Sequence, residues 1–127
     1  MEKERTFILI KPDAIERRLT NIIHNELFQK GLKLSADYEI LLTRENMLKW
    51  RNWPSYDEEF WLHVELMISS NVIVEIWEGK CAVSIALETK RYIRSEYAES
   101  RVRNILHCSD NISEAEEEIL LFSSFKE

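Results

Sequence analysis

The sequence predicts a small α/β sandwich of the α+β kind, in which helices pack on one β-sheet. Segments typical of strands alternate along the chain with segments whose apolar residues recur at helical spacing. Hairpin turn signals are few, and no repeat or low-complexity tract interrupts the pattern. With 127 residues, the chain is below the length at which a second domain is expected. We therefore expect one domain over residues 1–127, built from a single sheet and its covering helices.

The first half of the chain contains two predicted strands with a helical region between them. Residues 6–10 form a short apolar run that ends at a Lys-Pro-Asp triplet. Apolar residues then recur at helical spacing over 13–30, and Gly31 stands where a C-cap is expected. Thr20 is suited to cap a second helix, which would divide this region in two. Residues 32–42 alternate strictly between apolar and polar, which predicts a half-buried strand.

The second half of the chain is predicted to contain more helix than strand. The expected elements are, in order, helices over 45–51 and 57–69, a strand over 72–77, a helix over 81–91, a short strand over 103–106 and a helix over 113–122. Ser113 and Glu116 have the spacing of a capping box at the start of the last helix.

Composition excludes several classes of protein. The chain has two glycines and two prolines, where average usage gives about nine and about six. Because Gly31 and Gly79 stand alone, neither a P-loop nor a dinucleotide-binding loop is present. The net charge of −6 gives no general attraction for nucleic acid or a membrane surface. The first residues do not resemble a signal peptide, and no apolar run is long enough for a membrane span. Two cysteines are too few for a disulfide scaffold. We therefore expect a cytoplasmic protein.

His107 is the histidine best placed for chemistry. It follows a short predicted strand and opens a polar loop, which is where functional side chains of α/β proteins collect. His24 and His63 lie inside helical patterns and are better explained by packing, although His63 also suits a cleft. Many histidines end strands for structural reasons alone, so both interpretations of His107 remain open on this observation.

The cationic candidates are Lys11 and an arginine cluster in an otherwise acidic chain. Lys11 stands between a strand and a helix start, where the helix N-terminus adds positive potential for an anion. Arginine suits bidentate contacts with phosphate, and the cluster consists of Arg91, Arg94, Arg101 and Arg103. The competing explanation is a solvated turn for Lys11 and a solvated helix face for the arginines. The acidic run at 116–118 is likewise typical of a solvated helix face, from which one carboxylate can turn toward His107.

Several motifs, taken together and in order, resemble the nucleoside diphosphate kinase family. The chain begins with R-T-F-I-L-I-K-P-D-A at 5–14, continues with Q-K-G-L-K-L at 29–34, and has a strand ending in W-E-G at 77–79. It closes with N-I-L-H-C-S-D at 104–110, followed by S-E-A-E-E-E-I at 113–119. The resemblance extends over nearly the whole chain, and an ordered set of motifs is more specific than any one of them.

The resemblance implies a ferredoxin-like βαββαβ core with helices on an antiparallel sheet, and an enzyme that transfers the terminal phosphoryl group of ATP to a nucleoside diphosphate. The transfer would be ping-pong, through a phosphohistidine on His107. By position, Ser109 and Glu118 would orient His107, while Lys11, Arg94, Asn104 and Thr89 would contact the nucleotide. Mg²⁺ would arrive on the nucleotide phosphates, with no metal site in the protein itself. The family also implies a homo-oligomer, either a tetramer or a hexamer built from dimers.

The departures from the family pattern concern the nucleotide base and the oligomer. The two positions that hold the base fall at Glu59, with Phe60 beside it, and at Arg101. The family's active-site tyrosine falls at Asn52, for which Trp50 or Trp53 are the possible substitutes, and Arg91 is nearest to its second phosphate-binding arginine. The loop between Gly79 and Tyr92 is much shorter than in the family.

These departures leave two hypotheses. The first is an active kinase with little discrimination between bases. The alternative is a catalytically impaired module of the same fold, which acts in nucleotide binding or protein assembly.

Overall fold

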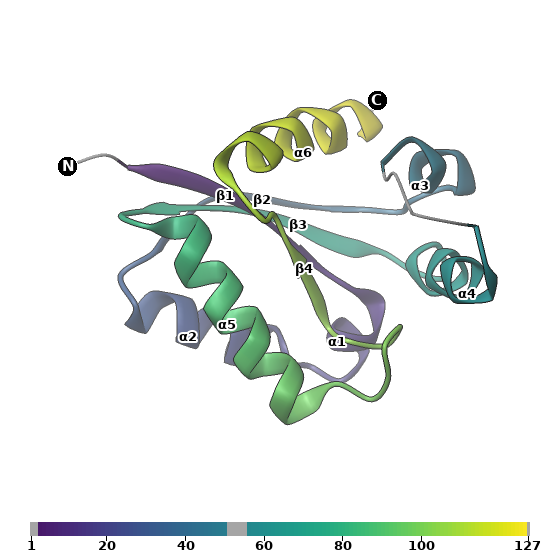
Figure 1. Ribbon diagram of the computed structural model, residues 1–127, viewed down its shortest axis with the longest axis horizontal. Coiled ribbons are helices and arrows are strands. Elements are labelled where there is room, and N and C mark those ends of the chain that lie inside the picture. The colour runs from purple at the N-terminus through teal and green to yellow at the C-terminus, as the bar shows by residue number, and fades with distance from the viewer. Residues whose placement is uncertain (1–2, 51–55, 127) are drawn as a thin grey trace.

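A computed structural model of the chain describes residues 3–50 and 56–126 (Figure 1). The elements are β1 (Glu4–Ile10), α1 (Pro12–Glu16), α2 (Thr20–Gln29), β2 (Lys33–Ile40), α3 (Arg44–Trp50), α4 (Glu58–Met67), β3 (Val72–Gly79), α5 (Ala82–Tyr97), β4 (Leu106–Cys108) and α6 (Ile112–Phe125). The four strands form one antiparallel sheet in the order β2-β3-β1-β4. The predicted α+β sandwich with a βαββαβ core is confirmed. None of the helices described is long and apolar enough to cross a bilayer.

Strand β1 lies in the middle of the sheet and divides the core into two layers. Because side chains alternate along a strand, Ile8 and Ile10 enter a cluster with α1, α2 and α5, whereas Phe7 and Leu9 enter one with α3, α4 and α6. Figure 1 shows these two sets of helices on opposite faces of the sheet. All four side chains are fully buried. The carboxyl end of this rigid central strand leads directly into Lys11.

The predicted helix over 13–30 is divided in two, as expected, but not by the expected cap. Arg18 lies in the left-handed region with φ of +59°, which ends α1. Leu19 is the N-cap of α2, with no side-chain capping bond, so the role predicted for Thr20 is wrong. At the other end, the prediction for Gly31 agrees with the structure. Its φ is +92°, and the backbone N–H groups of Gly31 and Leu32 donate to the carbonyls of Phe28 and Leu27 as in a Schellman motif.

The short strand predicted over 103–106 is displaced, and β4 spans Leu106–Cys108 instead. The physical cause is Ile105, whose φ of +84° is incompatible with an extended strand. Two bonds hold this residue: its N–H donates to the Asp13 carboxylate, and its carbonyl accepts the Lys11 backbone N–H. As a result His107 lies within β4, opposite Leu9 of β1, rather than after the strand.

Helix α5 differs from the prediction mainly in its C-terminal end, and helix α6 differs in the residue that caps it. Helix α5 continues six residues beyond the predicted end at Arg91, to Tyr97, because Ile93 keeps the apolar face of the helix in the core. Helix α6 is capped by Asn111, whose side chain accepts the N–H of Glu114, so the predicted Ser113–Glu116 capping box is wrong. Glu116 instead pairs with Arg5 at 2.6 Å.

A second histidine–carboxylate pair lies away from His107, between α2 and β3. Glu75 points into the core from β3, and one of its oxygens bonds His24 Nε2 while the other accepts from Trp77 Nε1. The hydrogen bond between His24 and the Glu75 carboxylate is the main reason that the pKa of His24 is raised. The interpretation of His24 as a packing residue agrees with this arrangement.

Candidate active site

His107 is held by a buried carboxylate. Its Nε2 lies 2.9 Å from Glu118 Oε2, and Glu118 itself projects from the first half of α6 into the protein with 3% of its surface exposed. The imidazole ring is packed edge-on between Phe7 and Trp50. Because β4 and α6 are joined by only three residues, strand and helix place these two side chains together.

The Glu118 carboxylate accepts two further hydrogen bonds. Ser109 Oγ donates to Oε1 at 2.5 Å, and Trp50 Nε1 donates to Oε2 at 2.8 Å. Burial raises the pKa of Glu118, but the bonds from His107, Ser109 and Trp50 outweigh this effect and leave the pKa below its ordinary value. The ionised carboxylate therefore accepts the His107 Nε2 proton, which fixes the tautomer and leaves Nδ1 as the basic nitrogen.

Lys11 lies beside this histidine strand and is almost completely buried, with 2% of its surface exposed. Its Nζ donates to the carbonyl of Val102 at 2.6 Å and to Asn104 Oδ1 at 2.7 Å. Burial is the main cause that lowers the pKa of Lys11 to about 7, and the neighbouring positive charge of Arg94 acts in the same direction. Lys11 is thus a buried cation whose proton is easily lost.

Arg94 reaches the same region from α5. Its Nη2 donates to the Leu106 carbonyl at 2.8 Å and its Nε to the Asn104 carbonyl at 3.3 Å. Lys11, Arg94 and Asn104 are therefore brought together, and the strand residue that follows Leu106 is His107. The arrangement gathers two cations and an amide around the segment that leads into the histidine strand, which suits an anionic substrate.

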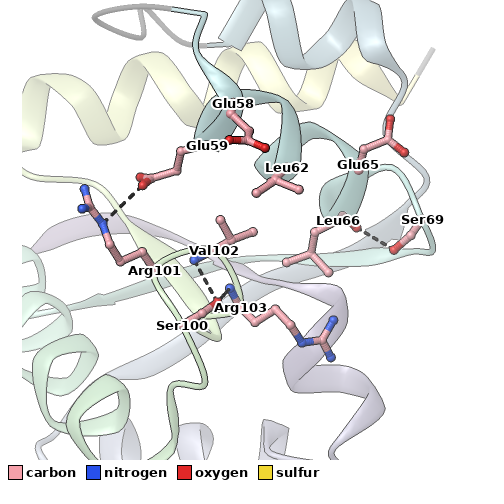
Figure 2. Close-up of a pocket in the computed structure, with 10 residues that line it drawn as sticks. All are labelled: Glu58, Glu59, Leu62, Glu65, Leu66, Ser69, Ser100, Arg101, Val102 and Arg103. Atoms are coloured by element: carbon pink, nitrogen blue, oxygen red, sulfur yellow. Dashed lines mark hydrogen bonds and ion pairs between the residues drawn. The ribbon is translucent and has the colours of Figure 1, made fainter.

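Two of the residues predicted to hold a nucleotide base, Glu59 and Arg101, line a groove (Figure 2). Arg101 Nε pairs with Glu59 Oε1 at 3.3 Å, and both side chains are solvent-accessible. The groove has a volume of about 890 Å³ and lies between α4 and residues 100–103. Leu62, Leu66 and Val102 form its apolar walls.

Two predicted nucleotide-binding residues are buried, and their contact with a nucleotide stays a prediction. Phe60 is fully buried in the core among Tyr56, Trp61 and the α3–α6 layer, because it faces the sheet from the inner side of α4. Thr89 is 1% exposed, and its hydroxyl accepts a hydrogen bond from Lys30 of α2.

The four residues named for the family's tyrosine and second arginine have different outcomes. Trp50 is part of the site through its bond to Glu118. Asn52 and Trp53 lie outside the described residues, and Arg91 is exposed on α5.

The sequence did not single out Asp13, and for His63 it left both packing and a position in a cleft open. The Asp13 carboxylate fixes the turn at Ile105 and so sets the start of the histidine strand. His63 of α4 has its Nε2 3.4 Å from the Arg101 carbonyl. Burial, together with the positive charges of Lys11 and Arg94, lowers the pKa of His63 to about 4. The K-P-D triplet was the available signal for Asp13, whereas the contacts of His63 depend on how α4 packs.

Cys108 takes no part in thiol chemistry. Burial raises the pKa of its thiol to about 12, and its Sγ contacts the carbonyl of Ala86. It fills a small space in the core next to His107, as the sequence predicted.

Among residues 3–50 and 56–126, His107, Glu114 and Glu118 bring possible metal-ligand atoms within 4.8 Å of one another. Glu118 is already committed to three hydrogen bonds, and Mg²⁺ prefers an octahedral set of oxygen ligands with several waters. The group therefore does not fit a magnesium cage of the protein's own.

The fold and site define a class of α+β protein in which a carboxylate-oriented histidine stands beside buried cations. Residues 4–127 match the family model "Nucleoside diphosphate kinase". The chain is 40% identical to the nucleoside diphosphate kinase of Encephalitozoon cuniculi over 94% of this chain and 88% of that protein. It is 35% identical to that of Methanocaldococcus jannaschii over 98% and 95% of the two chains.

Solved structures agree with the sequence comparison. An apo crystal structure of the Encephalitozoon cuniculi enzyme superposes with a TM-score of 0.83 at 38% identity, covering 94% of this chain and 88% of that one. A crystal structure of the Aquifex aeolicus enzyme gives a TM-score of 0.79 at 26% identity, with 95% of both chains covered. The chain belongs to the nucleoside diphosphate kinase family, and its activity is phosphoryl transfer between nucleotides.

Proposed function

We propose that the transfer is ping-pong and proceeds through a phosphohistidine on His107. The observation that carries this proposal is the 2.9 Å bond from His107 Nε2 to the buried Glu118 carboxylate, because it leaves Nδ1 as the one ring nitrogen able to attack. In the first half-reaction, Nδ1 forms a bond to the γ-phosphorus of ATP while the bond from that phosphorus to the β–γ bridging oxygen breaks. The nucleoside diphosphate leaves with the bond electrons.

The second half-reaction reverses these events. A β-phosphate oxygen of a second nucleoside diphosphate attacks the phosphorus, the N–P bond breaks, and its electron pair returns to Nδ1. Glu118 stabilises the positive charge that the imidazole carries while it is phosphorylated, and Ser109 holds the carboxylate in place. Phosphoryl transfer has a loose transition state, so positioning and charge neutralisation supply most of the catalysis.

Lys11 and Arg94 are the cations that would receive the phosphates, and Asn104 would contact the ribose. All three now bond one another or the backbone of residues 102–106, so the nucleotide has to replace part of these contacts. Mg²⁺ would be carried by the phosphates and neutralise part of their charge. The protein residues that act in the step are then His107, Glu118, Ser109 and Lys11.

Labelling with γ-³²P-ATP tests the proposal. We expect acid-labile, alkali-stable label on the wild-type chain, which a nucleoside diphosphate removes, and none on His107→Ala. His24→Gln is the matched control, because His24 also bonds a buried carboxylate through Nε2 and yet lies away from Lys11 and Arg94. Label that survives in His107→Ala, or label absent from the folded wild type, contradicts the phosphohistidine.

The alternative function is a module of the same fold that binds nucleotides or assembles without turnover. Its supporting observations are the burial of Phe60 and the Glu59–Arg101 pair at the base positions. Normal nucleotide binding combined with no labelling of His107 would favour this alternative. We further propose that residues 1–127 form a single domain of a cytoplasmic protein, and that the chain assembles as a homo-oligomer, either a dimer-based tetramer or hexamer.

A further inference from the structure

The groove between α4 and residues 100–103 has the form of a slot for a planar ring. One wall consists of Leu62 and Leu66 on α4, and Val102 projects from the facing segment (Figure 2). Aliphatic side chains on opposite walls suit both faces of an aromatic heterocycle. The exposed side chain of Leu62, with 53% of its surface accessible, is otherwise unexplained by packing.

The segment that forms one wall of the groove also binds the predicted phosphate residues. The side chain of Val102 lines the groove, while its carbonyl accepts from Lys11 Nζ. The carbonyl of Arg101, one residue earlier, accepts from Asn104 Nδ2 at 2.8 Å. The groove and the proposed phosphate-binding cations therefore lie on two sides of the same backbone segment. A single nucleotide can extend from one side of this segment to the other.

Charge sets the direction in which a nucleotide would lie. The α4 side of the groove carries three carboxylates, Glu58, Glu59 and Glu65, which repel phosphate. The facing segment carries Arg101 and Arg103, but both already pair with carboxylates. Lys11 and Arg94, on the other side of the segment, attract phosphate. The phosphates therefore belong near His107 and the base belongs in the groove.

The polar pair at the mouth of the groove is selective among bases. On one edge, guanine presents the acceptors O6 and N7, which an arginine contacts in a bidentate manner. On another edge it presents two donors, N1–H and the N2 amino group, which can bond to a carboxylate. Adenine places an amino group beside N7 and so lacks both complementary edges. Glu59 and Arg101 together match guanine, and their exposed ion pair is weak enough for a ligand to replace it.

We infer that Glu59 and Arg101 make guanine the preferred base over adenine in this groove. The inference rests on the proposed function, since it takes the phosphates to lie at His107. It differs from the low base discrimination expected from sequence, which followed from the missing aromatic contact and did not consider a polar one.

Calorimetric titration with GDP and with ADP, both with Mg²⁺, tests the inference on the whole chain. We expect GDP to bind about tenfold more tightly, which lies in the lower half of the range for one bidentate base contact. Glu59→Gln should lower the GDP/ADP ratio of affinities by roughly the same factor, because glutamine pairs with adenine instead. Glu88→Gln, an exposed glutamate on α5, is the matched control and should keep the wild-type ratio.

A second pair of variants tests the position of the base. Leu62→Glu replaces an apolar wall of the groove with a charge and should weaken GDP binding by roughly tenfold, because the carboxylate would have to be desolvated against the base. Leu120→Glu, at a leucine of α6 with 72% of its surface exposed, should not. The inference is overturned if the wild type binds GDP and ADP equally, prefers ADP or binds neither. It is also overturned if Leu62→Glu leaves the affinity for GDP unchanged. If GDP is preferred and γ-³²P-GTP nevertheless fails to label His107, the inference stands and the proposed phosphohistidine fails.

Discussion

At the scale of single residues, Lys11 carries the clearest electrostatic signature of the site. A neutral amine has two N–H groups, and the structure offers it two acceptors, the Val102 carbonyl and Asn104 Oδ1. Burial lowers its pKa to about 7, so both protonation states are populated near neutral pH. A phosphate placed beside Nζ would favour the charged form and raise this pKa again. We therefore predict that nucleotide binding at the proposed Lys11 site is coupled to proton uptake.

The coupling predicts a buffer-dependent heat of binding. At pH 8 free Lys11 is roughly one-tenth protonated, given its pKa of about 7, so ADP binding should take up close to one proton. At pH 6 the amine is already charged and uptake should be near zero. Calorimetry in two buffers of different ionisation enthalpy measures this number. Lys11→Arg, which stays charged, is the control; identical heats for the wild type in both buffers at pH 8 would refute the coupling.

Single residues also show how far a sequence motif can be carried into a structure. His107, Ser109, Glu118 and Asn104 lie within one short stretch, so their mutual geometry follows from β4, a three-residue link and α6. Phe60 and Thr89 belong to separate helices, and their exposure depends on how each helix rotates against the sheet. No pattern within the sequence reports that rotation, which is why the sequence did not predict that both side chains are buried.

At the scale of elements, the start of α6 is the feature that positions Glu118. Asn111 caps the helix by accepting the Glu114 N–H at 2.7 Å, and Glu114 in turn accepts the N–H of Asp110. Asn111→Ala should lower the free energy of unfolding by about 1 kcal/mol, the usual cost of removing an N-cap. Urea denaturation measures it. Ser113→Ala, which removes the cap expected from sequence, should change stability little, and an equal decrease in both variants would contradict this assignment.

The displacement of β4 has a similar origin at this scale. The apolar pattern at residues 103–106 is strand-like, but Ile105 is held at positive φ by two bonds to residues about 90 positions earlier in the chain. Long-range contacts of this kind override local propensity. The same contacts bring His107 into the strand and Lys11 next to it, so the element that sequence placed least accurately is the one that builds the site.

At the scale of the whole molecule, the sheet has two unequal edges. β4 has three residues, and the turn before it is anchored to Lys11 and Asp13. β2 has eight residues, five of them exposed, and Phe28 and Leu41 lie near its ends with more than half of their surface accessible. A long exposed edge strand is a ready surface for pairing with another chain. A second copy of the chain is the natural partner, because two identical edges can pair about a two-fold axis.

This edge supplies the prediction for the proposed oligomer. Light scattering should give a mass of at least two chains for the wild type, which has 127 residues. Ala36→Lys, at an exposed position near the centre of β2, sets bulk and charge against the partner strand and should shift the mass toward that of one chain. Ala98→Lys, at an exposed alanine after α5, is the matched control. A monomeric wild type would contradict the proposed oligomer. An oligomer whose mass is unchanged in Ala36→Lys would support the proposed oligomer but exclude β2 as the contact. The proposed nucleotide groove lies between α4 and residues 100–103, and neither β2 nor its neighbour β3 lines it. Loss of the dimer should therefore leave the preference between GDP and ADP unchanged.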